Sequence, residues 1–298
     1  MFAIIQDIRR MEFNNTVLST INHHLRDDNI RFYETGHKYE ILTDPDSKYT
    51  SVTTWNHHHF PKFDADAVIK NMMKGKNWNP TNKYWGMTPT EIKNMWSKNG
   101  ESVSSAGTNM HAYIEGFMNN PNIAAGYTHA DLFFEYNSKT SSTETAVSDP
   151  IETTLEWQYF LRFIGDHLHL KPYRTEWMIF HEDIKIAGSV DMIYENEDGS
   201  LSIYDWKRSK DIVKDPSFKK YATNPLISHI LDSNYWHYAL QLNTYKKILE
   251  DKYGKTVREL VLVRLHPDAV EKSYELIPLP ILTTEMDALF NERKQMFI

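Results

Sequence analysis

The chain has 298 residues, a formal net charge of −7 and no cysteine. The lack of cysteine excludes disulfides, zinc–thiolate sites and iron–sulfur clusters, so a bound metal would need carboxylates, histidines, carbonyls and water, which favour Mg²⁺ or Mn²⁺. The longest apolar runs are too short to span a bilayer and the N-terminus has no secretory pattern, which predicts an intracellular protein without a membrane segment.

The first hundred residues give short strand and helix signals. Residues 30–55 carry aromatic and β-branched side chains around a DPDS turn, which predicts short strands. Residues 64–75 and 88–100 predict short helices. In the second of these, Thr88 is the expected cap, Pro89 lies in the first turn and the final glycine is the expected stop.

The rest of the chain alternates helices and strands. Met110, Ile114 and Phe117 have helical spacing and should face a core, and residues 137–150, rich in Ser and Thr, predict a mobile loop. The helices and strands expected after residue 150, which include a short hairpin turn, predict an α/β (α+β) fold with a mixed sheet. The expected elements are a helix at 151–168, strands at 173–181, 185–195 and 201–207, a helix at 235–254, a strand at 257–266 and a helix at 283–297.

Two of these strands bring acids together. The segment NEDGS between them carries a hairpin signal, and antiparallel pairing across it places Asp191 opposite about residue 204, close to Asp205. Lys207 shares the face of Asp205, because residues two apart in a strand point the same way. A divalent cation relieves the repulsion of two carboxylates, and a lysine beside it offsets charge on a phosphate. Asp191, Asp205 and Lys207 together predict phosphodiester hydrolysis. An exposed cross-strand salt bridge explains the same three residues about equally well.

Two helices add polar side chains at four-residue spacing. His111 and Glu115 share a face, and a histidine there would complete a metal shell, whereas a simple surface pair accounts for them too. Gln241 and Tyr245 lie on the helix at 235–254. They would hold a nucleotide or position the lysine, and the alternative is a polar helix edge.

One segment combines cations with aromatic rings in spite of the acidic net charge. A channel for single-stranded DNA uses cations to contact phosphates and rings to stack on bases. A segment that contributes rings to a core and lysines to a solvated surface has the same composition. The residues are Lys70, Lys74, Lys76, Lys83, Trp78, Tyr84 and Trp85.

The ordered motifs GTNMHAYIE, TEW, AGSVDMI, YDWKRSK and QLNTY together resemble the RecB-like branch of the PD-(D/E)XK nuclease superfamily. Within it, the layout is similar to that of mitochondrial genome maintenance exonucleases and of viral and phage relatives. The resemblance implies a restriction-endonuclease-like core over residues 100–298, with a central mixed β-sheet flanked by helices. It also implies a mainly helical N-terminal extension over residues 1–99, as a cap on a DNA channel.

The resemblance further implies individual roles. The metal ligands that it implies for Mg²⁺ or Mn²⁺ are His111, Asp191, Asp205 and the main-chain carbonyl of Trp206. The catalytic residues that it implies are Asp191, Asp205 and Lys207. The substrate-binding residues that it implies are Gln241, Tyr245, Glu176, Glu115 and Arg208. In departures from the family pattern, Val190 stands where a proline often precedes the first acid, and the four-cysteine cluster of many RecB-like nucleases is impossible here.

The expected function is metal-dependent hydrolysis of DNA, as an exonuclease on single-stranded DNA or DNA with free ends, in repair or replication. One alternative keeps the core but cleaves RNA, as cap-snatching endonucleases do. Another is a nucleic-acid-binding protein without catalysis, and the simplest is a structural protein with a charged hairpin.

Overall fold

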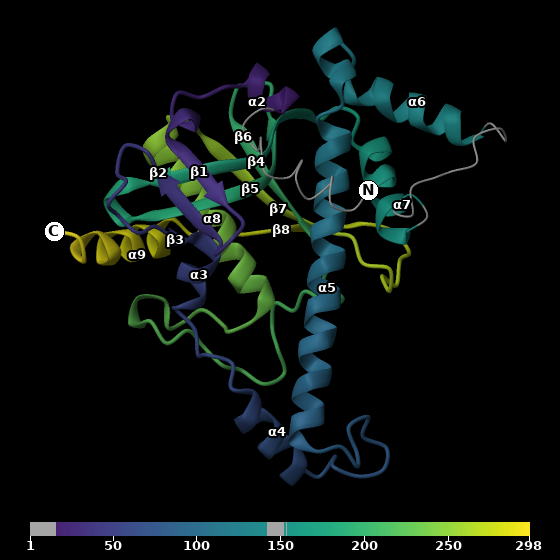
Figure 1. Ribbon diagram of the computed structural model, residues 1–298, viewed down its shortest axis with the longest axis vertical. Coiled ribbons are helices and arrows are strands. Elements are labelled where there is room, and N and C mark those ends of the chain that lie inside the picture. Colours follow the sequence, from purple (N-terminus) through teal and green to yellow (C-terminus); the bar gives the residue numbers. More distant parts are fainter. Residues whose placement is uncertain (1–15, 142–151, 153) are drawn as a thin grey trace.

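A six-stranded mixed sheet forms the centre of the protein (Figure 1). The computed structural model describes residues 16–141, 152 and 154–298. A separate two-stranded sheet is formed by β1 (Ile30–Tyr33) and β2 (Lys38–Ile41). The strands of the central sheet are β3 (Thr50–Ser51), β4 (Lys171–His181), β5 (Ile186–Glu195), β6 (Leu201–Lys207), β7 (Val257–Arg264) and β8 (Glu275–Pro278).

Helices cover this sheet and extend beyond it. The α-helices are α2 (Val17–Ile21), α3 (Val52–His57), α4 (Ala65–Lys74), α5 (Pro89–Met118), α6 (His129–Ser141), α7 (Leu155–Asp166), α8 (Asn234–Tyr253) and α9 (Thr283–Gln295). The short 3₁₀ turns are η1 (Asp27–Asn29), η2 (Pro121–Ala125), η4 (Glu182–Ile184) and η5 (Pro225–Ile227). None of the helices in the described part of the chain has the length and apolar character that crossing a membrane requires.

The sheet is mixed, as the sequence predicts. β5 pairs parallel with β3 and antiparallel with β4 and β6, whereas β6 pairs parallel with β7 and β7 antiparallel with β8. β4 lines one edge of β5, and the other edge is shared by β3 at Ile186–Ala187 and by β6 from Met192 onward. Along that edge the described strands leave residues 188–191 without a partner. This gap in the ladder is where Asp191 lies.

Two apolar clusters fill the two faces of the sheet. Leu240 and Ile248 of α8 belong to the cluster on one face, which also contains residues of α3 and α9. Met110 and Ile114 of α5 lie in the other cluster with aromatic residues of α7, and Phe117 packs against it half-buried. The predicted core-facing stripe of α5 is therefore confirmed.

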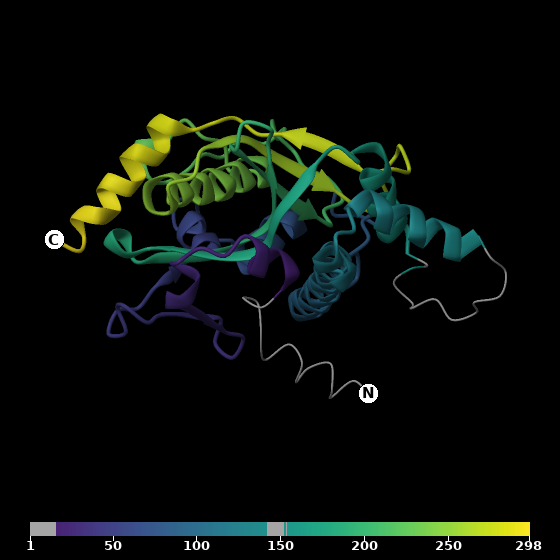
Figure 2. The ribbon, with the colours of Figure 1, turned by 90° about the horizontal axis from the view of Figure 1, so that it is seen from above.

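The sequence prediction of a helix ending at Gly100 is wrong. Thr88 caps α5 with a capping box to Glu91, as expected, but the helix continues without a break to Met118. Gly100 is exposed, and a side chain there would meet nothing within 4 Å. A glycine in a helix interior costs only about 1 kcal/mol, so it weakens this helix without ending it. The expected boundary at residues 99/100 thus falls inside α5, which stands end-on in Figure 2.

Three further differences concern two element bounds and one strand register. Residues 52–55, expected as strand, begin α3, because Ser51 caps the helix and both Val52 and Trp55 pack in the core. Residues 137–141, expected in a loop, end α6, and residues 142–150 lie outside the described part. The β5–β6 register differs by one residue from the prediction, since Met192 pairs with Tyr204.

Candidate active site

His111 on α5 reaches the end of β6. Its Nε2 lies 2.9 Å from the carbonyl oxygen of Trp206. Because a carbonyl oxygen only accepts hydrogen bonds, Nε2 carries the proton in this contact. The other ring nitrogen, Nδ1, lies 3.4 Å from Asp191 Oδ2 and 3.8 Å from Glu176 Oε1. The imidazole therefore turns its second nitrogen toward two carboxylates.

Asp191 is held where β5 and β6 separate. The last ladder pair of these strands is Met192 with Tyr204, and Asp191 lies directly before Met192 in β5. Its Oδ2 accepts the backbone N–H of Trp206 at 3.2 Å, so a side chain bridges the two strands beyond their ladder. This bond fixes the carboxylate at the gap in the sheet.

Glu176 faces the same point from β4. It lies level with Asp191, because the residues on either side of it pair with the residues on either side of Asp191. Its φ of 42° is in the left-handed region, which costs a residue with a side chain about 1–2 kcal/mol. Ser189 Oγ donates a hydrogen bond to its Oε2 at 2.9 Å. A strained backbone and a hydrogen bond thus aim this carboxylate.

His111, Glu176 and Asp191 together form a candidate metal centre. Each offers one ligand atom, and the three atoms lie within 4.8 Å of one another. Within residues 16–141, 152 and 154–298, no other three or more histidines and acids meet this criterion. The family resemblance implied Glu176 as a substrate-binding residue. Pairing the predicted strands at 173–181 and 185–195 across their short connection would have placed it within one residue of Asp191.

Asp205 and Lys207 share a face of β6, as predicted. Asp205 is 1% exposed, and its Oδ2 lies 2.5 Å from Lys207 Nζ. No hydrogen-bond donor of the described residues reaches Asp205 Oδ1. Lys207 Nζ also lies 4.7 Å from the ring centroid of Tyr238 on α8. Tyr204 and Trp206 point the other way, into the cluster with α5 and α7.

The site holds an excess of buried negative charge. Burial and the charge of Glu176 raise the pKa of Asp191, although His111 and Lys207 oppose this. Burial and the charge of Asp191 raise the pKa of Asp205 to about 6. Burial would lower the pKa of His111, but Asp191 and Glu176 outweigh it and raise the pKa to about 9.

Lys207 stays protonated in this surrounding. Burial alone would lower its pKa, but the carboxylates of Asp205 and Asp191 raise it above the ordinary lysine value. The ammonium group is therefore a fixed positive charge and hydrogen-bond donor at neutral pH.

These residues fit a hard divalent cation. Carboxylate oxygens and one imidazole nitrogen are ligands that Mg²⁺ or Mn²⁺ accepts, and the donor atoms already converge. Asp205 Oδ1 is buried without a donor, which is costly unless a cation or water satisfies it. A cation would also relieve the repulsion that raises the pKa values of Asp191 and Asp205.

Gln241 and Tyr245 of α8 lie beside the acids. Gln241 Nε2 donates to the Tyr245 hydroxyl at 3.1 Å. Burial, together with the charges of Asp191 and Asp205 among others, raises the pKa of Tyr245 well above its ordinary value. A Cβ added at Gly188 would lie 2.8 Å from the Tyr245 ring, so only glycine lets this ring approach β5.

Helical spacing could have revealed one further neighbour of the site. Tyr238, whose ring lies near the Lys207 ammonium, precedes Gln241 by three residues and Tyr245 by seven, so all three share one stripe of α8. The sequence prediction did not include it.

Glu115 and Arg208 lie at the margin of this arrangement. Glu115 is half-buried one turn after His111 on α5. Arg208 follows Lys207, and its Nε donates to Glu156 Oε1 of α7 at 2.6 Å. The guanidinium is thus anchored to α7.

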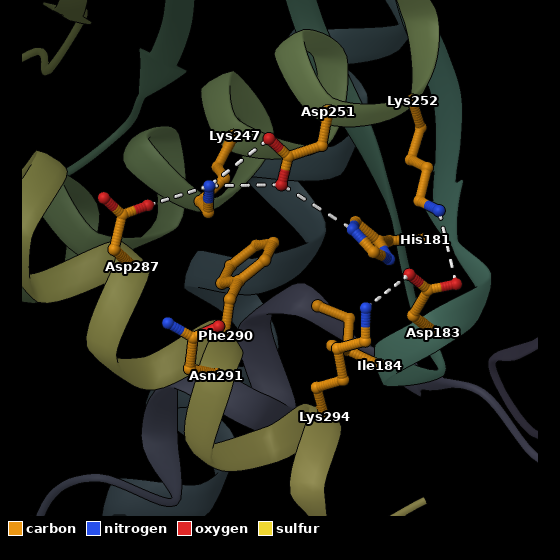
Figure 3. Close-up of a pocket in the computed structure, with 10 residues that line it drawn as sticks. All are labelled: His181, Asp183, Ile184, Lys247, Asp251, Lys252, Asp287, Phe290, Asn291 and Lys294. Carbon is orange, nitrogen blue, oxygen red and sulfur yellow. Dashed lines mark hydrogen bonds and ion pairs between the residues drawn. The ribbon is translucent and has the colours of Figure 1, made fainter. Parts of the chain in front are cut away.

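A pocket of about 290 Å³ lies elsewhere, between the end of β4 and helices α8 and α9 (Figure 3). None of the site residues lines it. Lysines and aspartates on its wall are paired with one another, for example Lys247 with Asp287 at 2.9 Å and Lys252 with Asp183 at 3.3 Å. Because these charges are balanced, the pocket has little net charge with which to select a charged ligand.

Comparison with known proteins supplies one finding. The family model of the PD-(D/E)XK nuclease superfamily matches residues 91–296, which include every strand from β4 to β8 and all of the residues described above for the site. No curated protein matches the chain.

Proposed function

Because the chain belongs to the PD-(D/E)XK nuclease superfamily, we propose that it is a divalent-metal-dependent deoxyribonuclease, acting as an exonuclease on single-stranded or end-bearing DNA. Superfamily membership supports metal-dependent cleavage of nucleic acid. The observation that carries the proposal is the convergence of His111, Glu176 and Asp191 beside a buried Asp205 and its lysine. The histidine and the Gln241–Tyr245 pair support the RecB-like branch.

We assign the cation to a small group of side chains. His111, Glu176 and Asp191, whose ligand atoms converge, would hold it. We also assign to it Asp205, which lies outside that group of three, and the Trp206 carbonyl, which accepts the hydrogen bond from His111. When bound, Mg²⁺ or Mn²⁺ neutralises charge on the phosphate and lowers the pKa of a water molecule. The protein contributes ligands that are already fixed by a strand gap, a backbone N–H and a serine hydroxyl.

Lys207 would stabilise charge at the scissile phosphate. Its ammonium is protonated and is positioned by Asp205 and the Tyr238 ring. A donor of this kind offsets charge that develops on phosphate oxygens and orients the attacking water. It is no general base, because its pKa is raised.

The remaining contacts would bind substrate. Gln241 would present its amide to DNA while Tyr245 keeps it in place. Arg208, anchored by Glu156, would contact a phosphate near the cleaved bond. Glu115 would position His111 or a water molecule from the next turn of α5.

The test is digestion of DNA labelled at one end, offered as single strands, duplexes and circles. We expect cleavage in Mg²⁺ or Mn²⁺, none in EDTA, and resistance of circular DNA. Asp205→Asn should abolish cleavage, while Asp46→Asn, which removes an exposed carboxylate outside the site, should leave it unchanged.

Three outcomes separate the alternatives. Cleavage of circles would replace exonuclease with endonuclease action, and preferential cleavage of RNA of the same sequence would move the activity to RNA. Metal-independent binding of DNA without any cleavage in Mn²⁺ would overturn the proposed catalysis.

A further inference from the structure

A helical arm, defined as residues 65–98, projects from the body of the protein (Figure 1). It consists of α4, the connection that follows and the first part of α5. The arm has its own small core, in which Ile69 and Ile92 are buried. Trp96 Nε1 also donates to the Tyr84 hydroxyl at 2.9 Å, which ties the connection to the helix. The arm is therefore an ordered surface.

The arm is basic in an acidic protein. It contains six lysines, no arginine, one aspartate and one glutamate, a formal charge of 6 − 2 = +4, so the rest of the chain carries −7 − 4 = −11. Lys93 pairs with Asp66 at 2.8 Å. The other five lysines are exposed, and no acid of the described residues lies within ion-pair distance of them. These five are Lys70, Lys74, Lys76, Lys83 and Lys98.

Aromatic rings lie among these lysines. The rings of Trp78 and Trp85 are 5.6 Å apart, and Trp85 is 46% exposed. Lys83 Nζ lies 4.7 Å from the ring centroid of Tyr84. Indole rings at a surface, beside unpaired ammonium groups, match a polyanion that also carries flat apolar faces.

We propose that the helical arm is a docking surface for single-stranded DNA, which it holds at a distance from the active site. This rests on the proposed function, because the arm and the site then engage one strand. Duplex DNA would satisfy the lysines but not the rings, since its bases are stacked inside.

α5 sets the distance between the two surfaces. At 1.5 Å per residue, Lys98 lies roughly 20 Å and Pro89 roughly 33 Å from His111 along the helix. A stacked strand rises 3.4 Å per nucleotide, so it needs about 6 to 10 nucleotides to span this length. Shorter substrates would reach the site without touching the arm.

The first test measures binding without cleavage. Anisotropy of a labelled thymidine strand of about 20 nucleotides is followed against salt concentration in EDTA. Lys76→Ala with Lys83→Ala should weaken binding and make the slope of log affinity against log salt shallower by about 1.4. Trp85→Ala should weaken binding by about tenfold and leave the slope unchanged. Lys38→Ala with Lys48→Ala removes two exposed lysines outside the arm and should change nothing.

The second test measures cleavage against strand length in Mn²⁺. The value of kcat/KM should rise with length to a plateau at about 10 nucleotides, and the arm double variant should lose this rise while cleaving the shortest strands normally. Equal binding by the arm and control doubles would overturn the arm proposal and leave the nuclease proposal intact. Wild-type binding with the expected variant effects but no cleavage would overturn only the nuclease. Competition by polyglutamate as strong as by DNA would also overturn the arm proposal, because it would show a charge surface without base stacking.

Discussion

The imidazole of His111 donates from Nε2 to the carbonyl oxygen of Trp206 at 2.9 Å, and this contact joins α5 to the end of β6. It leaves Nδ1 toward Asp191 and Glu176, which raise the pKa of the histidine to about 9. In the absence of a cation, a proton on Nδ1 offsets those carboxylates. A metal ion bound there must displace that proton.

His111→Ala should therefore weaken metal binding. We expect the Mn²⁺ concentration for half-maximal cleavage to rise by at least about 10- to 100-fold, the loss that is typical when even an outer-shell partner of a metal is removed. The loss of rate at saturating Mn²⁺ should be smaller, since the carboxylates remain. A titration of activity against Mn²⁺ measures both. His58→Ala, which removes an exposed histidine, is the matched control. An unchanged Mn²⁺ requirement would remove His111 from the metal site.

Lys207→Ala should lower the rate of cleavage without unfolding the protein. Losing a positioned donor of this kind costs about 10²- to 10³-fold in rate. Lys210→Ala is the control on the same segment, because Lys210 is exposed and lies 3.7 Å from Asp268 at the surface. Single-turnover rates and thermal unfolding should be measured for both. A near wild-type rate for Lys207→Ala would contradict the assignment.

Two substitutions at Glu176 distinguish the effect of its strained backbone on stability from the effect of its carboxylate on metal binding. Glu176→Gln and Glu176→Gly should both weaken Mn²⁺ binding, because each removes the negative charge of the carboxylate. The glycine variant should be more stable than the glutamine variant by about 1 kcal/mol, because glycine adopts the positive φ without strain. Chemical denaturation and calorimetric Mn²⁺ titration test the two effects. A glutamine variant as stable as the glycine variant would show that the backbone is unstrained.

Two buried histidines should make stability depend on pH. Burial lowers the pKa of His59 and of His181 to about 4, and each has a ring nitrogen without a hydrogen-bond partner among the described residues. His181 lies between α8 and α9, with Asp251 3.7 Å from its Nε2 (Figure 3). Below pH 6.5 the unfolded chain takes up protons that the folded state does not, so unfolding becomes easier.

The stabilisation from these histidines is complete above pH 6.5 and is lost as the pH falls toward 4, by about 3 kcal/mol for each residue. Replacing His181 with glutamine should flatten the dependence of the unfolding free energy on pH between 6.5 and 4. His169→Gln, at an exposed position, should leave the dependence as it is. Parallel curves for wild type and His181→Gln would contradict the buried neutral state.

Much of this arrangement could be predicted from local sequence. Alternation and a hairpin turn give the three central strands, and the four-residue spacing of His111 and Glu115 gives their shared face. β6 spans the residues expected, and Gly254 ends α8 with a φ of 62° as a left-handed cap. These features depend on neighbours in the chain.

What could not be predicted depends on packing between distant segments. Val52 and Trp55 are in a helix because the sheet and α8 bury them, although their segment favours a strand. Gly100 does not interrupt α5, because the helix is buried on either side of it, at Ile92 and at Met110. The need for glycine at position 188 could not be predicted either, because it depends on the Tyr245 ring of α8.

The central claim is that His111, Glu176 and Asp191 hold one divalent cation. The most direct test is anomalous scattering from crystals soaked in Mn²⁺. We expect a peak within about 2.5 Å of a carboxylate oxygen of Asp191 and within similar reach of His111. Asp191→Asn crystals soaked in the same way should lose it. A Mn²⁺ peak elsewhere, such as in the pocket of Figure 3, with none at Asp191 would contradict the account.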